Sequence, residues 1–143
     1  MLASLSDDQL HLSIGKEMGT LGKQFRHIGN IRSCYIGALR TDVMDFRTQS
    51  TNHEIEENKK KLLAYLKSSD RKIVSLLSDL TEAELTNKTI DWRGTHQAYG
   101  FVSTEKHLSA LIEHELLHEG ELVVYFRLLG LNFPASWGVW GFR

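Results

Sequence analysis

Apolar residues recur every three or four positions in three long stretches of this chain, which is the spacing of an amphipathic α-helix. The stretches span about residues 15–42, 54–80 and 103–129, and a shorter one covers 6–12. Ser103 is a suitable N-cap for the last long stretch, and Gly130 after it is a suitable left-handed C-cap. No segment shows the alternation of a half-buried strand. The pattern therefore predicts an all-α protein.

The only proline, Pro134, lies close to the C-terminus, so nothing breaks long helices over the first 130 residues. A chain of 143 residues suits one domain with one core, and we expect residues 1–143 to form it. Residues 132–143 hold four aromatic side chains among glycines. We expect this aromatic tail to fold back over the helices or to enter a subunit contact, with a wall of a substrate site as the alternative.

Charge and apolar run length exclude several classes of protein. Seventeen Lys and Arg nearly balance eighteen Asp and Glu, and the densest basic run, 59–61, follows two glutamates. Because nucleic-acid binders concentrate positive charge, we expect no nucleic-acid partner. No apolar run approaches the roughly 20 residues of a membrane span, and residues 1–12 lack the pattern of a signal peptide. We therefore expect a cytoplasmic protein that does not contact a membrane.

Two histidines in the last stretch are candidate metal ligands. His114 and His118 are four positions apart, so both imidazoles lie on one helix face and can reach one ion. The same strip carries Leu111 and Tyr125 and is expected to face the core. An unpaired buried polar group costs roughly 1–3 kcal/mol, and a metal ion would satisfy both rings. A hydrogen-bonded histidine network is the alternative, because buried histidines also bond carbonyls.

Residues 114–118 also read as H-E-x-x-H, the pattern in which zinc peptidases use the glutamate as general base. The context argues against a metallopeptidase. Gly120 follows His118 by two residues rather than three, and no histidine comes after it. The sequence also shows no strand that would hold a peptide beside the site. A peptidase is therefore a disfavoured alternative.

The histidine pair needs a third ligand, and His27 is the best placed. Its strip in the first long stretch carries Ile31 and Cys34, and Cys34 is interpreted as a small core residue. Two helices that each turn an imidazole inward can meet at one ion. His107 is the second choice, but it lies about 10 Å from His114 along the helix axis, too far to share the ion. His53 and His96 lie in connections and have no spacing argument.

Several segments resemble the DinB superfamily. Residues 114–121, 125–130 and 133–137 read HELLHEGE, YFRLLG and FPASW. They are similar to the family's last helix, which commonly reads H-x-x-x-H-x-G-Q, then a tyrosine or leucine-rich turn with arginine, then glycine, and a proline before tryptophan. Residues 22–28, GKQFRHI, look like the family's other ligand helix. The resemblance covers roughly residues 15–48 and 90–140, and the last-helix motif is its most specific part.

The resemblance implies a four-helix bundle of the DinB type, often a homodimer, whose first helix is short or missing here. It also implies one divalent metal ion, commonly zinc or nickel, held by His27, His114 and His118 with open positions for water. Family members of known chemistry include bacillithiol transferases and mycothiol-dependent isomerases, so a low-molecular-weight thiol or another small molecule is the implied partner. The family's glutamine is Glu121 here, a carboxylate that could pair with a cation or hold a water.

We therefore expect a metal-dependent enzyme. Three neutral imidazoles leave coordination positions free, and a metal there lowers the pKa of a bound water or thiol. A thiolate would make the protein an S-transferase, and an activated water would make it a hydrolase. Glu115 and Glu119 point about 100° away from the ligands, so neither is assigned a role. A non-catalytic metal-binding bundle, with the ion serving stability or sensing, is the alternative.

Overall fold

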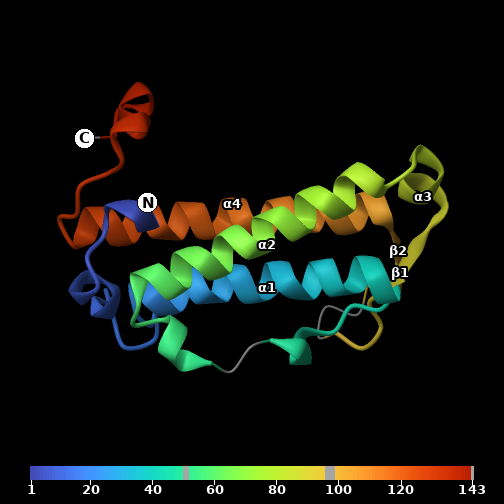
Figure 1. Ribbon diagram of the computed structural model, residues 1–143, viewed down its shortest axis with the longest axis horizontal. Coiled ribbons are helices and arrows are strands. Elements are labelled where there is room, and N and C mark those ends of the chain that lie inside the picture. The colour runs from blue at the N-terminus through green and yellow to red at the C-terminus, as the bar shows by residue number, and fades with distance from the viewer. Residues whose placement is uncertain (50–51, 96–98, 143) are drawn as a thin grey trace.

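The computed structural model describes residues 1–49, 52–95 and 99–142. Three long helices lie lengthwise beside one another: α1 (Leu21–Thr41), α2 (Lys59–Asp79) and α4 (Thr104–Leu128) (Figure 1). A short helix, α3 (Glu82–Asn87), lies at one end of them. The all-α, four-helix architecture predicted from the sequence is thereby confirmed.

The helix boundaries follow from local capping. The side chains of Thr20, Asn58 and Ser103 each accept a hydrogen bond from the backbone N–H three residues later, which starts α1, α2 and α4. The first two helices therefore begin about five residues later than the apolar pattern predicted. Gly130 has a φ of 63°, and the N–H of Leu131 donates to the carbonyl of Phe126. This Schellman arrangement ends α4 where the sequence predicted it.

Two elements differ from the prediction. Strands β1 (Thr89–Asp91) and β2 (Phe101–Ser103) form an antiparallel pair, with Ile90 opposite Val102, although no strand was expected. Three residues are too few for an alternating pattern to stand out. The helix expected over residues 6–12 is a 3₁₀ turn, Asp8–His11, preceded by another at Leu2–Ser4.

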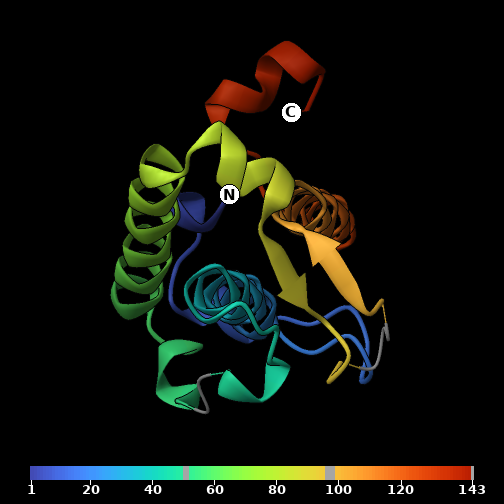
Figure 2. The same cartoon turned by 90° about the vertical axis from the view of Figure 1, so that its right-hand side faces the viewer.

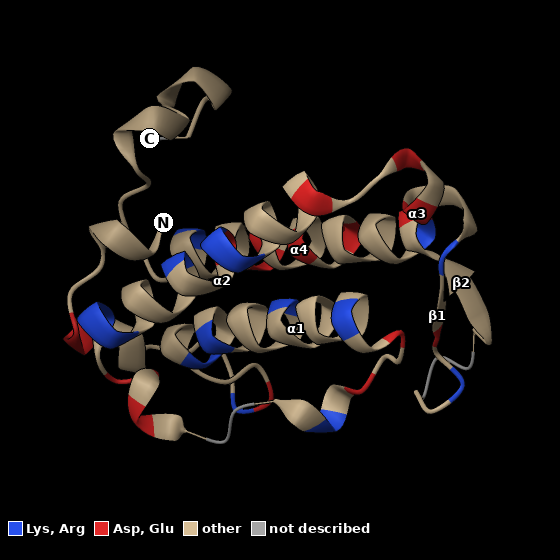
Figure 3. Ribbon diagram, turned by 45° about the vertical axis from the view of Figure 1, so that its right-hand side comes forward, with Lys and Arg blue, Asp and Glu red and all other residues tan. Residues whose placement is uncertain are grey.

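Helix α1 is the central helix of the bundle. Viewed end-on, it lies between α2 and α4, and it makes the main helix contacts with both (Figure 2). It carries four basic residues and no acidic one, whereas α4 carries five glutamates against one lysine and one arginine (Figure 3). Arg32 of α1 forms ion pairs with both neighbouring helices: its guanidinium pairs with Glu115 of α4 and with Asp70 of α2. Opposite charges therefore support the packing that brings α1 and α4 together.

Two groups of buried residues lie along α1. In the first, the N-terminal segment with its 3₁₀ turns packs against the three long helices; its members are Leu2, Leu5, Leu10, Leu21, Phe25, Ile28, Leu62, Leu122, Tyr125 and Phe126. The second packs strands β1 and β2 against the other half of α1, where Cys34 is buried, which confirms Cys34 as a core residue; it comprises Ile31, Cys34, Tyr35, Ala38, Leu39, Met44, Ile90, Trp92, Val102 and Leu111.

The aromatic tail contacts the bundle through Phe133 and through Phe142, whose ring lies 5.2 Å from the guanidinium of Arg127 of α4. Phe133 packs against the first group of buried residues and its ring lies 4.9 Å from that of Phe142. The rest of the tail forms a 3₁₀ turn, Ala135–Trp140, that stands away from the helices in Figure 1. Val139 and Trp140 are 84% and 76% exposed. The tail therefore stacks largely on itself and covers only the end of α4, and its expected part in a subunit contact stays a prediction.

Within the described ranges, no helix combines the length and the apolarity that crossing a bilayer requires.

Candidate metal centre

The three histidines singled out in the sequence lie at one place, on the contact between α1 and α4. His27 comes from α1, and His114 and His118 come from α4. Each offers one ring nitrogen, and these nitrogens all lie within 4.8 Å of one another. The ring centres are 4.8 Å apart for His27 and His118, and 4.4 Å for His114 and His118. On the same strip of α4, Leu111 and Tyr125 are buried as predicted.

The spacing of the α4 nitrogens fits a metal ion. Nε2 of His114 and Nε2 of His118 are 3.1 Å apart. Ligand nitrogens about 2.0–2.1 Å from a tetrahedral ion are separated by about 3.3 Å, close to this distance. Nδ1 of His114 is buried and, among the described residues, has no hydrogen-bond partner. An ion on Nε2 and a hydrogen bond between the two rings would each engage Nε2 of His114 and leave this Nδ1 without a partner, so the triad is one that could hold a metal ion on the spacing of its nitrogens.

Glu121 fixes the orientation of one ring. Its Oε2 lies 2.6 Å from Nδ1 of His118, so the ring donates its Nδ1–H to the carboxylate. The lone pair of Nε2 is then directed toward the other two histidines. Ligand histidines in metal sites commonly use a carboxylate in this way, and the contact raises the basicity of the coordinating nitrogen. Glu121, which stands where the family commonly has a glutamine, therefore pairs with the candidate ligand His118.

Electrostatics keep two of the rings neutral. Burial, followed by the nearby His118, lowers the pKa of His27. Burial is also the main cause that lowers the pKa of His114 to about 4, with His118 and His27 contributing further. Because only the neutral imidazole has a free lone pair for a metal, these shifts prepare both rings as ligands near neutral pH.

His107, the second-choice ligand, has a structural role instead. Its ring is fully buried; Trp92 Nε1 donates to its Nδ1 at 3.2 Å, and its Nε2 lies 3.1 Å from the carbonyl oxygen of Tyr35. Burial lowers its pKa to about 4. Both ring nitrogens are thus satisfied within the protein. Of the histidines in connections, His53 is exposed and contacts Glu56, and His96 lies outside the described residues.

The glutamate of the H-E-x-x-H pattern does not face the triad. Glu115 pairs with Arg32 on another side of α4. A general base of a zinc peptidase must reach the nucleophile at the metal, and this carboxylate is held elsewhere. The arrangement agrees with the sequence argument against a peptidase.

A cavity of about 640 Å³ opens beside the triad, a size typical of small-molecule sites. The sequence analysis missed most of its lining, because Phe46, Gln49 and Tyr99 come from connections that have no periodic pattern. Tyr35 is the lining residue that the sequence could have revealed, since it lies eight positions after His27, which places both on the same face of α1. The lining consists of the three histidines with Ile31, Tyr35, Phe46, Gln49, Tyr99, Ala110, Glu113 and Leu117.

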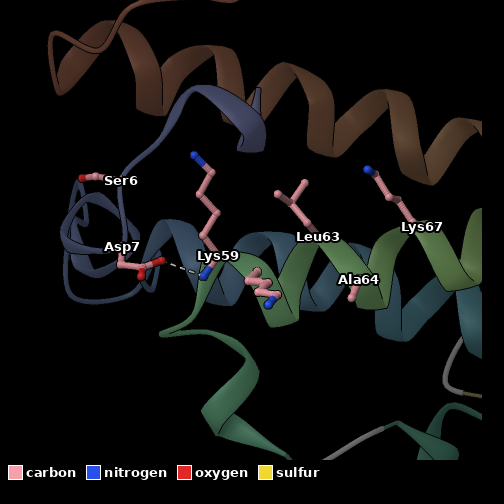
Figure 4. A pocket seen from close by; sticks show the side chains of 7 residues that line it. Ser6, Asp7, Lys59, Leu63, Ala64 and Lys67 are labelled. Atoms are coloured by element: carbon pink, nitrogen blue, oxygen red, sulfur yellow. Dashed lines mark hydrogen bonds between the residues drawn. The ribbon is translucent and has the colours of Figure 1, made fainter.

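Another hollow lies between the N-terminal segment and the start of α2 (Figure 4). Lys59, Lys60 and Lys67 line it, and Asp7 accepts a hydrogen bond from the backbone N–H of Lys59 at 2.8 Å. It contains none of the triad residues, so it is separate from the candidate metal centre.

Comparison with protein families gives a match to the DinB family over residues 1–140. The chain belongs to the DinB family. This confirms the resemblance seen in the sequence, and it agrees with a triad that could hold a metal, since the DinB family is associated with metals in general.

Two solved structures support the DinB fold. A DinB-like protein of Bacillus subtilis is 21% identical, with a TM-score of 0.71, over 92% of this chain and 83% of that one. A DinB-like protein of Bacillus cereus is 22% identical, with a TM-score of 0.72, over 94% of this chain and 85% of that one. No curated protein matches the sequence. At these identities the likeness shows the fold alone.

Proposed function

We propose that this DinB-family protein binds one divalent metal ion, zinc or nickel, through His27, His114 and His118 and acts as a metal-dependent enzyme on a small molecule. The observation that carries the proposal is the convergence of three imidazoles from two helices beside a cavity of about 640 Å³. Three ligands leave coordination positions open, as in catalytic rather than structural sites.

When bound, the ion would lower the pKa of a thiol or water toward neutrality. The surrounding side chains supply the rest of the site. Glu121 holds His118 in the tautomer whose Nε2 faces the cavity. The buried side chain of Ile31 provides an apolar wall beside the reacting groups.

We propose thiol transfer as the reaction, because the family resemblance includes thiol-dependent transferases. The thiol loses its proton to solvent, its sulfur forms a bond to an electrophilic carbon, and the halide on that carbon leaves with the bonding electrons. Hydrolysis at the same site is the second reaction, with water in place of the thiol. A non-catalytic metal-binding bundle is the alternative. It differs from the enzyme only in that no reacting thiol or water binds at the open coordination positions of the ion.

Metal analysis of protein purified without a histidine tag tests the centre itself. We expect about one zinc or nickel ion per chain, and its loss in His27→Ala and His118→Ala. His11 is exposed and lies outside the cavity, so His11→Ala is the matched control and should keep the ion. Metal retained by both triad variants would overturn the proposal.

A second measurement separates the enzyme from the non-catalytic bundle. We expect the metal-loaded protein to accelerate the loss of a low-molecular-weight thiol with an aryl halide or an epoxide. No acceleration with any cellular thiol, in a protein that holds its ion, would favour the non-catalytic role. Sedimentation of the same sample tests the homodimer, which stays a prediction.

A further inference from the structure

Among the described residues that line the cavity outside the triad, Tyr35 of α1 is the buried polar one. It is 3% exposed, whereas Gln49 is half-buried. Tyr99 and Glu113 are exposed, and Lys106 borders an adjoining hollow together with both of them. The charged groups thus lie where solvent reaches them, and the buried wall carries a phenol.

The hydroxyl of Tyr35 has no hydrogen-bond partner within the described part of the chain. Other tyrosines use theirs inside the protein: Tyr65 donates to Oδ1 of Asn30 at 2.7 Å, and Tyr125 donates to the carbonyl oxygen of Met18 at 2.6 Å. The Tyr35 oxygen is not one of the fully enclosed atoms that lack a partner, so it keeps some surface toward the cavity. Because buried tyrosine hydroxyls usually find a partner, this one is available to a ligand.

The phenol of Tyr35 is held in place and keeps its proton. Its ring centre lies 4.7 Å from that of His107 and 5.7 Å from that of Trp92. Burial, with the charge of Glu113 as the next cause, raises the pKa of Tyr35 to about 12, so the hydroxyl stays a donor near neutral pH. A donor that is already fixed loses little conformational entropy when a ligand binds.

This donor and the triad lie at different places along the cavity. Tyr35 follows His27 by eight residues, which is about 12 Å along the axis of α1. Its neighbour His107 precedes His114 by seven residues, which is about 10 Å along α4. Ile31 lines the wall between the two ends. A ligand that contacts both the ion and the phenol is therefore an elongated molecule.

We propose that Tyr35 determines specificity by donating a hydrogen bond to a carbonyl-type oxygen at the far end of an elongated substrate whose reacting group lies at the triad. This inference rests on the proposed function, because the metal centre holds the other end of the same molecule. The class of substrate that fits has a reacting group, an apolar middle beside Ile31, and an acceptor oxygen. A molecule that is too short, or that lacks this oxygen, gains nothing from Tyr35.

Calorimetric titration of the metal-loaded protein with three thiol probes tests the inference. The long probe is the N,N-dimethylamide of a mercapto acid with a six-carbon chain, which carries an acceptor oxygen and no N–H. The same amide of mercaptoacetic acid is too short, and hexanethiol lacks the oxygen. We expect Tyr35→Phe to weaken binding of the long probe by about three- to tenfold, the usual effect of one hydrogen bond, and to change the other two by less than about twofold.

Tyr65→Phe is the matched control, because its hydroxyl is bonded inside the protein and it does not line the cavity. We expect this variant to lower the Tm and to keep all three affinities. Tyr35→Phe should keep the Tm, since it removes no hydrogen bond within the described chain. A purely structural role of Tyr35 would instead lower the Tm and weaken all three probes alike.

The inference is overturned if Tyr35→Phe binds the long probe as tightly as the wild type, or if it weakens the three probes equally. Metal content is measured on every sample, and the titrations are repeated on metal-free protein. A wild type that holds no metal, but whose affinity for the long probe still depends on Tyr35, contradicts the proposed function and supports the inference. A protein that holds its metal and binds the long probe independently of Tyr35 does the opposite.

Discussion

The carboxylate of Glu121 is hydrogen-bonded to the imidazole of His118, with Oε2 2.6 Å from Nδ1. The two residues are three positions apart on α4, so the helix itself sets their distance. One end of the ring is thus held by the protein, and the other end faces His27 and His114. This contact gives the candidate centre a rigid ligand before any ion arrives.

Removal of the Glu121 carboxylate should weaken metal binding. We expect Glu121→Ala to raise the metal Kd by about 10- to 100-fold, the usual cost of losing a partner of a ligand histidine. Glu121→Gln keeps an acceptor for Nδ1–H and should lose less. Competition against a chromophoric chelator measures both. Equal affinities for the wild type and the alanine variant would show that the carboxylate does not support the ligand.

Metal should also stabilise the fold, because the triad joins α1 to α4. An ion at 100 times its Kd adds about 2.7 kcal/mol to the free energy of unfolding, which corresponds to a rise in Tm of roughly 5–10 °C for a chain of this size. Calorimetric melting with zinc and with a chelator measures the difference. An equal rise in His27→Ala would place the stabilising ion somewhere else.

Acid should destabilise the metal-free protein through His107. Its pKa is lowered to about 4 in the folded state, from 6.5, so the unfolded chain binds more protons between these values. The stabilisation is complete above pH 6.5 and is lost as the pH falls toward 4, by up to about 3 kcal/mol. His27 and His114 act in the same direction.

Urea unfolding at several pH values, with wild type and His107→Gln, isolates this contribution. The variant is expected to be less stable at pH 7.5, because the hydrogen bond from Trp92 is altered, and to lose less stability between pH 6.5 and 4.5. Parallel curves for the two proteins would contradict the assignment.

The contact between α1 and the segment that precedes α2 depends on a glycine. A Cβ added at Gly22 would meet the backbone carbonyl of Glu56, which cannot move as a flexible side chain can. We expect Gly22→Ala to lower the free energy of unfolding by about 1–3 kcal/mol. Gly37→Ala, on the same helix, meets nothing within 4 Å and should be neutral or stabilising by up to about 1 kcal/mol. Denaturant unfolding compares them, and equal stabilities would refute the close approach.

The sequence predicted the geometry within each helix better than the contacts between helices. The four-residue interval fixes His114 and His118 on one face because helical periodicity is local. Their meeting with His27 needs α1 and α4 to be neighbours, which was inferred from the apolar strip around His27 and from the family resemblance. Phe46 and Tyr99 reach the cavity from connections, where no period exists to reveal them. The short strands were missed for the same reason.

Helix α2 contributes no side chain to the lining of the cavity beside the triad. Substitutions on its outward face therefore leave the positions of the candidate metal ligands on α1 and α4 unchanged. A fluorescent dye or a surface anchor attached to that face would report on the protein, or immobilise it, while the reactive side stays open to solution.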